Sequence, residues 1–150
     1  MNIQWKCILF EELTVHELYA IMHLRNEVFV VEQNCVFQDA DFKDQSCHHL
    51  MAWDTEQNKL AAYTRLVPPG VAYREMSIGR VITSPAYRGV GLGKLLMEKS
   101  ILNCSLIFGE KPIKIGAQLY LKKMYESFGF QQIGEIYDED GIQHIHMLRN

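Results

Sequence analysis

The segment Ser84–Leu96, with the sequence SPAYRGVGLGKLL, combines glycines at alternate positions with two basic side chains. Glycine destabilises a helix, so three glycines in so short a segment indicate a turn whose bare backbone lies against something that it binds. Hydrophobic patterning predicts a strand before this segment and a helix after it. A helix that begins in such a turn directs unpaired N–H groups and the positive end of its dipole at an anion. The segment therefore predicts a phosphate site, to which Arg88 and Lys94 add positive charge.

Two common phosphate-binding patterns do not fit this segment. The dinucleotide pattern GxGxxG fails because its last glycine would fall at Lys94 or Leu96, and because no acidic residue follows about 20 positions later. The Walker A pattern fails because three residues, not four, separate Gly89 from Gly93, and because Leu95 stands where Ser or Thr is needed. A nucleotide-binding regulator that uses the same backbone amides is an alternative, and these failed spacings weigh against it.

The spacing that does fit is R-x-x-G-x-G, formed by Arg88, Gly91 and Gly93, and it resembles the coenzyme A loop of the GNAT superfamily of acetyl-CoA-dependent N-acyltransferases. A second segment, YESFGF at 125–130, resembles the YExxGF sequence that ends the last major helix of that family. Longer stretches resemble the ElaA-like branch of the superfamily; they are residues 24–44, 48–50, 78–93 and 139–147. The resemblance therefore covers nearly the whole chain.

The order of the predicted elements agrees with this resemblance. Strands are expected at 3–10, 49–53, 60–67, 75–83, 113–117, 131–137 and 144–148, and helices at 14–29, 91–107 and 118–130. The chain of 150 residues is long enough to bury a substantial core, and a single domain over residues 1–150 is expected. The expected fold is of the α/β class, a GNAT-like mixed and mostly antiparallel sheet with helices on both faces. The resemblance adds that two neighbouring parallel strands of this sheet splay apart.

The resemblance implies acetyl-CoA as the co-substrate, with its pantetheine arm lying in the gap between the splayed strands. The backbone of the strand before the glycine loop would pair with the arm, and the N–H groups of the loop would hold the pyrophosphate. Gln118 stands where many relatives have an Asn that contacts the cofactor. The residues implied in cofactor binding are Val81, Ile82, Thr83, Arg88, Gly89, Val90, Gly91, Leu92, Gly93, Lys94 and Gln118.

The chemistry implied by the resemblance is direct attack of an amine on the acetyl thioester within a ternary complex. This reaction needs an uncharged amine, a stabilised oxyanion and a proton for the departing thiolate. Tyr125 occupies the position of the tyrosine that points at the thioester sulfur in the family. A phenol with an ordinary pKa of about 10 stays protonated at pH 7 and can donate that proton. The resemblance therefore implies that Tyr125 is the general acid.

The general base is left open between several residues. Some relatives carry a Glu on the strand that leads to the glycine loop, at a position that is Ser77 here. Glu75 lies two residues earlier, on the same face of a regular strand, and could act through a water molecule. Glu32 is an alternative because the segment after the first helix lines the acceptor side in relatives. A neutral His49 or His144 could also accept a proton.

The expected acceptor is a primary amine of a small molecule or of a protein. The residues expected to bind it are Phe29, Glu32, His49 and His144. A rim of acidic side chains close to Glu32 would attract a cationic amine; these acids are Asp39, Asp41 and Asp44. Alternatively, three arginines would receive a carboxylate of the acceptor; they are Arg25, Arg65 and Arg80.

Composition and charge limit which classes of protein the sequence can represent. A net charge of −3 argues against a nucleic-acid-binding protein, and no apolar stretch approaches the roughly 20 residues that span a bilayer. The polar N-terminus is unlike a signal peptide, so a cytoplasmic protein is expected. No metal site is expected, because the four cysteines form no CxxC pair and His144 and His146 share a strand face without a third ligand. A non-catalytic acetyl-CoA sensor is the main alternative to an enzyme, and a homodimer is compatible with the sequence.

Overall fold

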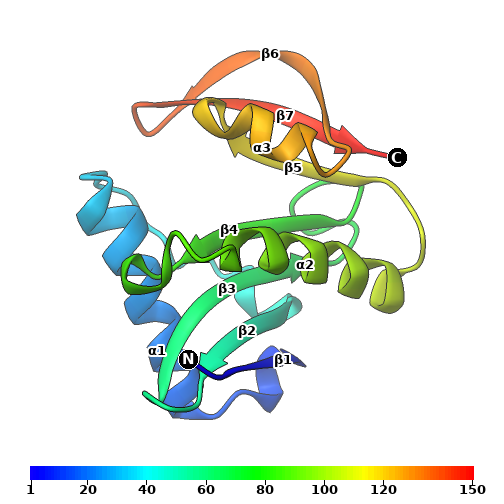
Figure 1. The fold of residues 1–150 in the computed structure, drawn as a ribbon. Coiled ribbons are helices and arrows are strands. Elements are labelled where there is room, and N and C mark those ends of the chain that lie inside the picture. Colours follow the sequence, from blue (N-terminus) through cyan, green and yellow to red (C-terminus); the bar gives the residue numbers. More distant parts are fainter.

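The computed structural model describes residues 1–150 and contains seven strands and three α-helices (Figure 1). The strands are β1 (Ile3–Leu9), β2 (His48–Asp54), β3 (Lys59–Val67), β4 (Ser77–Thr83), β5 (Ile113–Gln118), β6 (Gln131–Glu139) and β7 (Ile142–Arg149). The helices are α1 (Val15–Arg25), α2 (Leu92–Phe108) and α3 (Lys122–Glu126). All seven expected strands are present. None of the helices is both long and apolar enough to cross a membrane.

The strands form two sheets that meet at one point. β1, β2, β3 and β4 form an antiparallel sheet in chain order, and β5, β7 and β6 form a second antiparallel sheet in that spatial order. The sheets are joined by a parallel bridge between Met76 and Ile113, where the Lys114 N–H donates to the Met76 carbonyl at 3.0 Å. Beyond this bridge β4 and β5 are not paired, so they separate along their length. The expected mixed sheet with a splayed parallel pair is confirmed.

Helices α1 and α2 cover opposite faces of the first sheet. Ile21 and Leu24 of α1 pack in one buried cluster with Met51 of β2. Leu96 of α2 packs in another with Leu50. Adjacent strand residues point to opposite faces, so the two helices lie on opposite sides. A third cluster joins α2 and α3 to the inner residues of β5 and β7; it includes Met97, Cys104, Ile115, Ala117, Tyr125, Phe130, Ile145 and Met147.

The first helix begins as predicted but does not stay α-helical. The Thr14 hydroxyl accepts from the Glu17 N–H at 3.0 Å, and the Glu17 carboxylate accepts from the Thr14 N–H at 2.8 Å, which is a capping box. After Arg25 the chain continues as a π-helical segment, Asn26–Glu32. Two further wide turns follow, in which the N–H groups of residues 33 and 35 donate five residues back. The predicted end at residue 29 therefore falls inside a wider helix that extends toward the gap between the sheets.

The third helix is much shorter than the predicted range 118–130. Gln118 is the last residue of β5, because its extended backbone pairs with His144 of β7, so no helix can begin there. Its end matches the prediction at Gly129, whose φ of +93° is the left-handed conformation that glycine adopts readily. The Gly129 N–H donates to Glu126 and the Phe130 N–H donates to Tyr125, as in a Schellman motif.

A two-residue turn joins β6 to β7. Asp140 and Gly141 both have positive φ, at +53° and +83°, which is the pattern of a type I′ hairpin turn. Glu139 is therefore opposite Ile142, and residue 137 is opposite His144. Because directly opposed residues share a face of the sheet, Glu139 and His144 project to the same side.

Candidate active site

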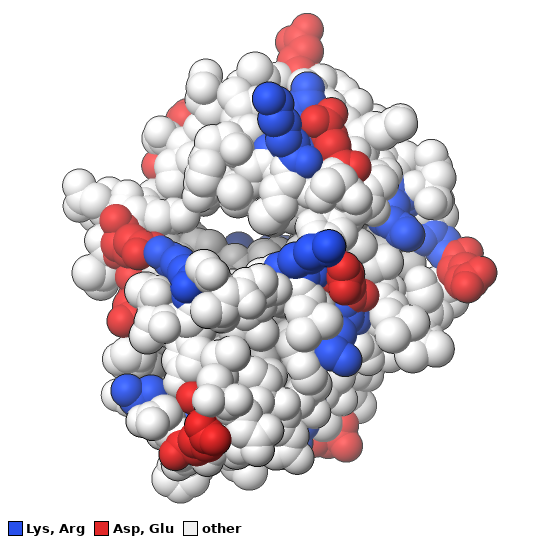
Figure 2. Space-filling model, in the orientation of Figure 1, with Lys and Arg blue, Asp and Glu red and all other residues white.

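A cavity of about 520 Å³ lies between β4 and β5. It is lined by every residue of the ranges 78–83 and 115–118. Consecutive strand residues point to opposite faces, so only an opening along the strand edges can be lined by all of them. The cavity therefore passes through the layer of strands where β4 and β5 separate, and the surface is hollowed between the two halves of the molecule (Figure 2).

One end of the cavity, the loop end, lies beside the turn that precedes α2. Gly89 and Gly91 have φ of +83° and +82°, and Gly91 is the N-cap of the 17-residue helix α2. Nothing lies within 4 Å of the position that a Cβ would take at either glycine, so the backbone is open to a ligand. The N–H groups of the first turn of α2 have no acceptor within the helix. The sequence predicts an anion site at this turn.

Six of the eleven predicted cofactor residues line the cavity, and the other five do not. Val81, Ile82, Thr83, Arg88, Gly93 and Gln118 line the cavity. Four others are exposed and lie outside the lining, in the turn or at the start of α2: Gly89, Val90, Gly91 and Lys94. The Leu92 side chain is buried in the core against β2 and β3. The loop therefore offers its backbone, while Leu92 anchors the start of α2.

Arg88 and Glu32, for which the sequence predicts separate roles, form an ion pair. Both terminal nitrogens of Arg88 donate to the Glu32 carboxylate at 2.8 Å, and Arg88 Nε donates to the Thr83 carbonyl at 3.1 Å. The hydrogen bonds from Arg88 lower the pKa of Glu32. A carboxylate held in this way is a weak proton acceptor, so the pair connects the end of the π-helical segment to the glycine turn.

Tyr125 reaches the cavity from α3. Its side chain is 6% exposed and packs edge-to-face on Phe130, with ring centroids 6.0 Å apart. Burial, with a smaller effect of Tyr120, raises the pKa of Tyr125 to about 12. Its hydroxyl therefore keeps its proton at neutral pH. The hydroxyl makes no hydrogen bond within the chain, so it is free to donate to a bound group.

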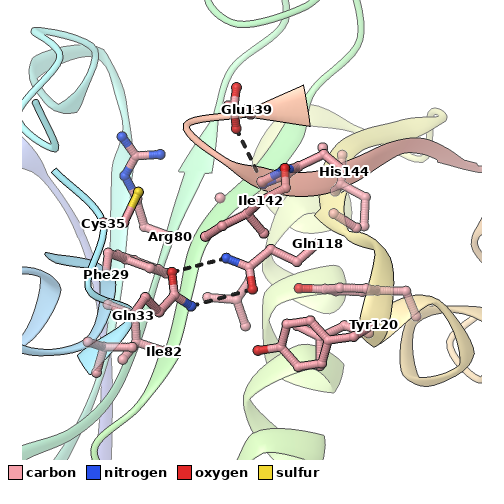
Figure 3. A pocket seen from close by; sticks show the side chains of 18 of the residues that line it. Phe29, Gln33, Cys35, Arg80, Ile82, Gln118, Tyr120, Glu139, Ile142 and His144 are labelled. Carbon is pink, nitrogen blue, oxygen red and sulfur yellow. Dashed lines mark hydrogen bonds and ion pairs between the residues drawn. The ribbon is translucent and has the colours of Figure 1, made fainter. Parts of the chain in front are cut away.

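A pair of amide side chains spans the cavity. Gln118, at the end of β5, and Gln33, after the π-helical segment, exchange hydrogen bonds of 3.2 and 3.4 Å (Figure 3). Each amide thus donates to the carbonyl oxygen of the other. The pair bridges the cavity between its loop end and the opposite end.

The opposite end, called here the hairpin end, lies under the β6–β7 turn; its lining includes Phe29, Cys35, Phe37, Arg80, Glu139, Ile142 and His144. Arg80 has a φ of +50° in an irregular part of β4, where the register with β3 shifts. Its guanidinium lies 6.0 Å from the ring centre of Phe29 and 5.8 Å from that of Phe37. The Cys35 thiol donates to the Asp140 carbonyl at 3.3 Å, which ties the hairpin to the segment after α1.

His144 has a defined tautomer at this end. Its Nδ1 lies 2.8 Å from the Ile142 carbonyl, which can only accept, so Nδ1 carries a proton. Its Nε2 lies 3.4 Å from the Glu139 carboxylate (Figure 3). The imidazole is nearly buried and stacks on Tyr137, with ring centroids 5.7 Å apart. His144 therefore presents Nε2 and a carboxylate together.

The acidic rim and the arginine receptor expected from the sequence are both wrong. The three aspartates pair with the three arginines in one network: Arg25 with Asp39 and Asp44, Arg65 with Asp41 and Asp44, and Arg80 with Asp39 and Asp41. The guanidinium of Arg25 is fully buried. Burial alone would raise the pKa of Asp44, but Arg25 and Arg65 lower it overall. Of the six residues only Arg80 lines the cavity, and its guanidinium is paired with Asp39 and Asp41, so the network leaves no unpaired charge for an acceptor.

His49 does not lie at the cavity, contrary to its predicted role in substrate binding. It is 1% exposed; Nε2 donates to the Asp44 carbonyl at 2.9 Å, and Nδ1 accepts from the Tyr63 hydroxyl at 2.6 Å. Burial lowers the pKa of His49, so it stays neutral. Both nitrogens are engaged, and the residue supports the ion network.

Glu75 also lies outside the cavity. It precedes β4 next to Met76, at the end where β4 and β5 are joined, and its carboxylate lies 4.0 Å from Arg74. The splay opens in the other direction, toward Thr83. Alternation along a strand predicts which face a residue shares, but it does not specify the end of the strand at which the cavity opens.

Several lining residues were missed in the sequence. For Gln33, Cys35 and Phe37 there is no periodic signal, because they follow an irregular helix end. Glu139 was detectable, because a two-residue turn at Asp140–Gly141 places it beside His144. The structure contains no group of three His, Cys, Asp or Glu side chains that could hold a metal ion.

Comparison with known proteins identifies the family. A model of the acetyltransferase (GNAT) domain matches residues 26–149. The chain is 42% identical to the protein ElaA of Escherichia coli over 149 residues, which cover 98% of this chain and 96% of ElaA. The crystal structure of E. coli ElaA superposes with a TM-score of 0.91 at 41% identity, covering 99% of this chain and 100% of ElaA. An acyl-CoA N-acyltransferase from Pseudomonas aeruginosa superposes with a TM-score of 0.92 at 42% identity, covering 98% and 99%. The chain belongs to the GNAT acetyltransferase family, in its ElaA-like branch.

Proposed function

We propose that the protein is an N-acetyltransferase that moves the acetyl group of acetyl-CoA to a primary amine by direct attack in a ternary complex. One observation carries this proposal: a single cavity passes between β4 and β5, with Arg88 and Gly93 of the glycine turn at its loop end and titratable side chains at its hairpin end. Two substrates can therefore meet from opposite faces of the sheet. Membership of the GNAT family supports the acyl-CoA chemistry.

The loop end fits the acyl donor. The edge of β4 that faces the cavity has no strand partner at Val81–Thr83, so its backbone groups are free to pair with the amides of a pantetheine arm. The glycine turn and the first N–H groups of α2 would hold the pyrophosphate, with Lys94 at its edge. Gln118 would contact the arm once its pairing with Gln33 opens.

Tyr125 would protonate the leaving thiolate. The phenol is buried, protonated and free of internal partners, which is what a general acid needs. Tyr125 belongs to the buried cluster that includes Phe130, on which its ring packs, so its position is set by packing.

The proposal is tested by calorimetric titration with acetyl-CoA, with ATP and NADH as controls, followed by detection of free coenzyme A and acetylated product with a panel of primary amines. Selective binding in the micromolar range, about −8 kcal/mol, with transfer to an amine supports the proposal. Binding without transfer favours an acetyl-CoA sensor. A folded protein that does not bind acetyl-CoA, or that prefers ATP, contradicts both.

A further inference from the structure

We propose that His144 is the general base of this transfer and that Glu139 draws the charged amine to it, an inference that rests on the proposed function. The other bases considered from the sequence are excluded by their positions or by the groups with which they pair. Glu75 lies outside the cavity, His49 has both ring nitrogens engaged, and Glu32 is held in a bidentate ion pair.

The hydrogen bond at Nδ1 sets the role of His144. Because the Ile142 carbonyl fixes the proton on Nδ1, the neutral ring has its lone pair on Nε2. Nε2 and the Glu139 carboxylate lie 3.4 Å apart on one face of the hairpin. Two acceptors side by side suit an ammonium group, whose N–H groups can donate to both.

The fold holds this pair in place before a substrate arrives. The type I′ turn sets Glu139 and His144 on one face, and Tyr137 stacks on the imidazole. The Cys35 thiol ties the turn to the segment after α1. The His144 side chain is 10% exposed, whereas that of Glu139 is 61% exposed, so the carboxylate meets a cation first and the imidazole lies deeper.

The proposed reaction is balanced. His144 Nε2 accepts one proton from the ammonium group, which leaves an uncharged amine. The amine nitrogen forms a bond to the thioester carbonyl carbon, and the carbon–sulfur bond breaks with its electron pair remaining on sulfur. The thiolate receives the Tyr125 proton, and the second proton of the amine nitrogen restores the phenol through solvent. His144 releases its proton to water, so the products are an N-acetylated amine, coenzyme A and one proton.

The pH profile distinguishes this role from a structural one. Only unprotonated His144 can act as a base, so kcat/KM should rise with pH, and this rise should require His144. The titratable groups that face the imidazole are Glu139 and Tyr137 on β6, and His146 on its own strand. His146 provides a matched control, because it also packs on Tyr137 but does not line the cavity.

The experiment compares His144→Gln, His146→Gln and Glu139→Gln with the wild type, using acetyl-CoA and three amines: a monoamine, a diamine and a lysine side chain in an N-acetylated peptide. His144→Gln should lower kcat by roughly 10²–10⁴-fold and remove the rising limb, with acetyl-CoA affinity unchanged as the test of folding. Glu139→Gln should mainly raise KM for the amines. His146→Gln should change neither rate nor profile.

The outcomes separate this inference from the function on which it rests. Wild-type transfer that His144→Gln leaves intact in rate and pH profile overturns the assignment of the base alone. Equal losses in His144→Gln and His146→Gln also overturn it, because they indicate a structural effect of the hairpin. A wild type that transfers to no amine overturns the proposed function itself.

Discussion

The loop end and the hairpin end of the cavity are built in different ways. The loop end consists of a glycine turn and the start of α2, which lie next to each other in the chain. The hairpin end combines residues of the segment after α1, of β4 and of the β6–β7 hairpin, and it rests beside the network of three arginines and three aspartates. A generic anion site needs only local backbone, whereas recognition of a second substrate depends on side chains brought from afar.

The largest effect is expected at the meeting point of the two ends. Tyr125→Phe removes the proposed acid but keeps the packing on Phe130, so kcat should fall by roughly 10²–10⁴-fold. Calorimetry should show unchanged acetyl-CoA affinity, because the pyrophosphate site is separate. Wild-type turnover in this variant would show that Tyr125 is not the general acid.

The buried arginine–aspartate network beside the hairpin end should contribute strongly to the stability of the fold. Arg25→Met leaves Asp39 and Asp44 short of a partner, and breaking a buried pair costs about 3–5 kcal/mol. Denaturation with urea measures this loss in the free energy of unfolding. Arg74→Met is the control, because the Arg74 side chain is 94% exposed and should contribute little. Equal stability of the two variants would contradict the importance of the network.

The same network should make the protein sensitive to acid. The pKa values of Asp41 and Asp44 are lowered in the folded state, because their arginine partners outweigh the effect of burial. The stabilisation is therefore complete above the unfolded pKa of about 3.9 and is lost as the pH falls below about 4. Urea midpoints measured from neutral to acidic pH should fall steeply in the wild type and less steeply in Arg25→Met.

At the loop end, a matched pair of glycine variants separates strain from binding. Gly91→Ala and Gly70→Ala both force alanine into left-handed backbone, with φ of +82° and +89°, and each should destabilise the protein by about 1–2 kcal/mol. Only Gly91→Ala should also weaken acetyl-CoA binding, because Gly70 lies in a distant turn. Equal affinity in both variants would show that the turn does not hold the pyrophosphate.

The smallest effect on turnover is expected at the ion pair of Glu32 and Arg88, which connects the π-helical segment to the glycine turn. Glu32→Gln frees an exposed arginine and removes a partly exposed carboxylate, so turnover should change less than in the variants above. A loss as large as that of Tyr125→Phe would instead make Glu32 the base, and its pH profile would then lose the limb assigned to His144.

Much of the fold was predictable because its signals are local. Capping at Thr14, the end of α3 at Gly129 and the order of strands follow from neighbouring residues. The length of α3 was not predictable from helical spacing, because pairing of Gln118 with β7 extends the strand into the expected helix. The π-helical continuation of α1 likewise has no local signal in the sequence.

The sequence by itself determined the family and the glycine turn, because these depend on residue type and short spacing, and the family resemblance in turn implied the splayed sheet. Only the tertiary structure decided which charged residues face the cavity. Asp39, Asp41 and Asp44 stand close to Glu32 in the chain, yet they are neutralised by arginines from α1, β3 and β4. Glu139 and His144 meet because a turn fixes the register of their strands. The sequence specifies which side chains are charged, but contacts between distant segments decide whether each charge is paired or free.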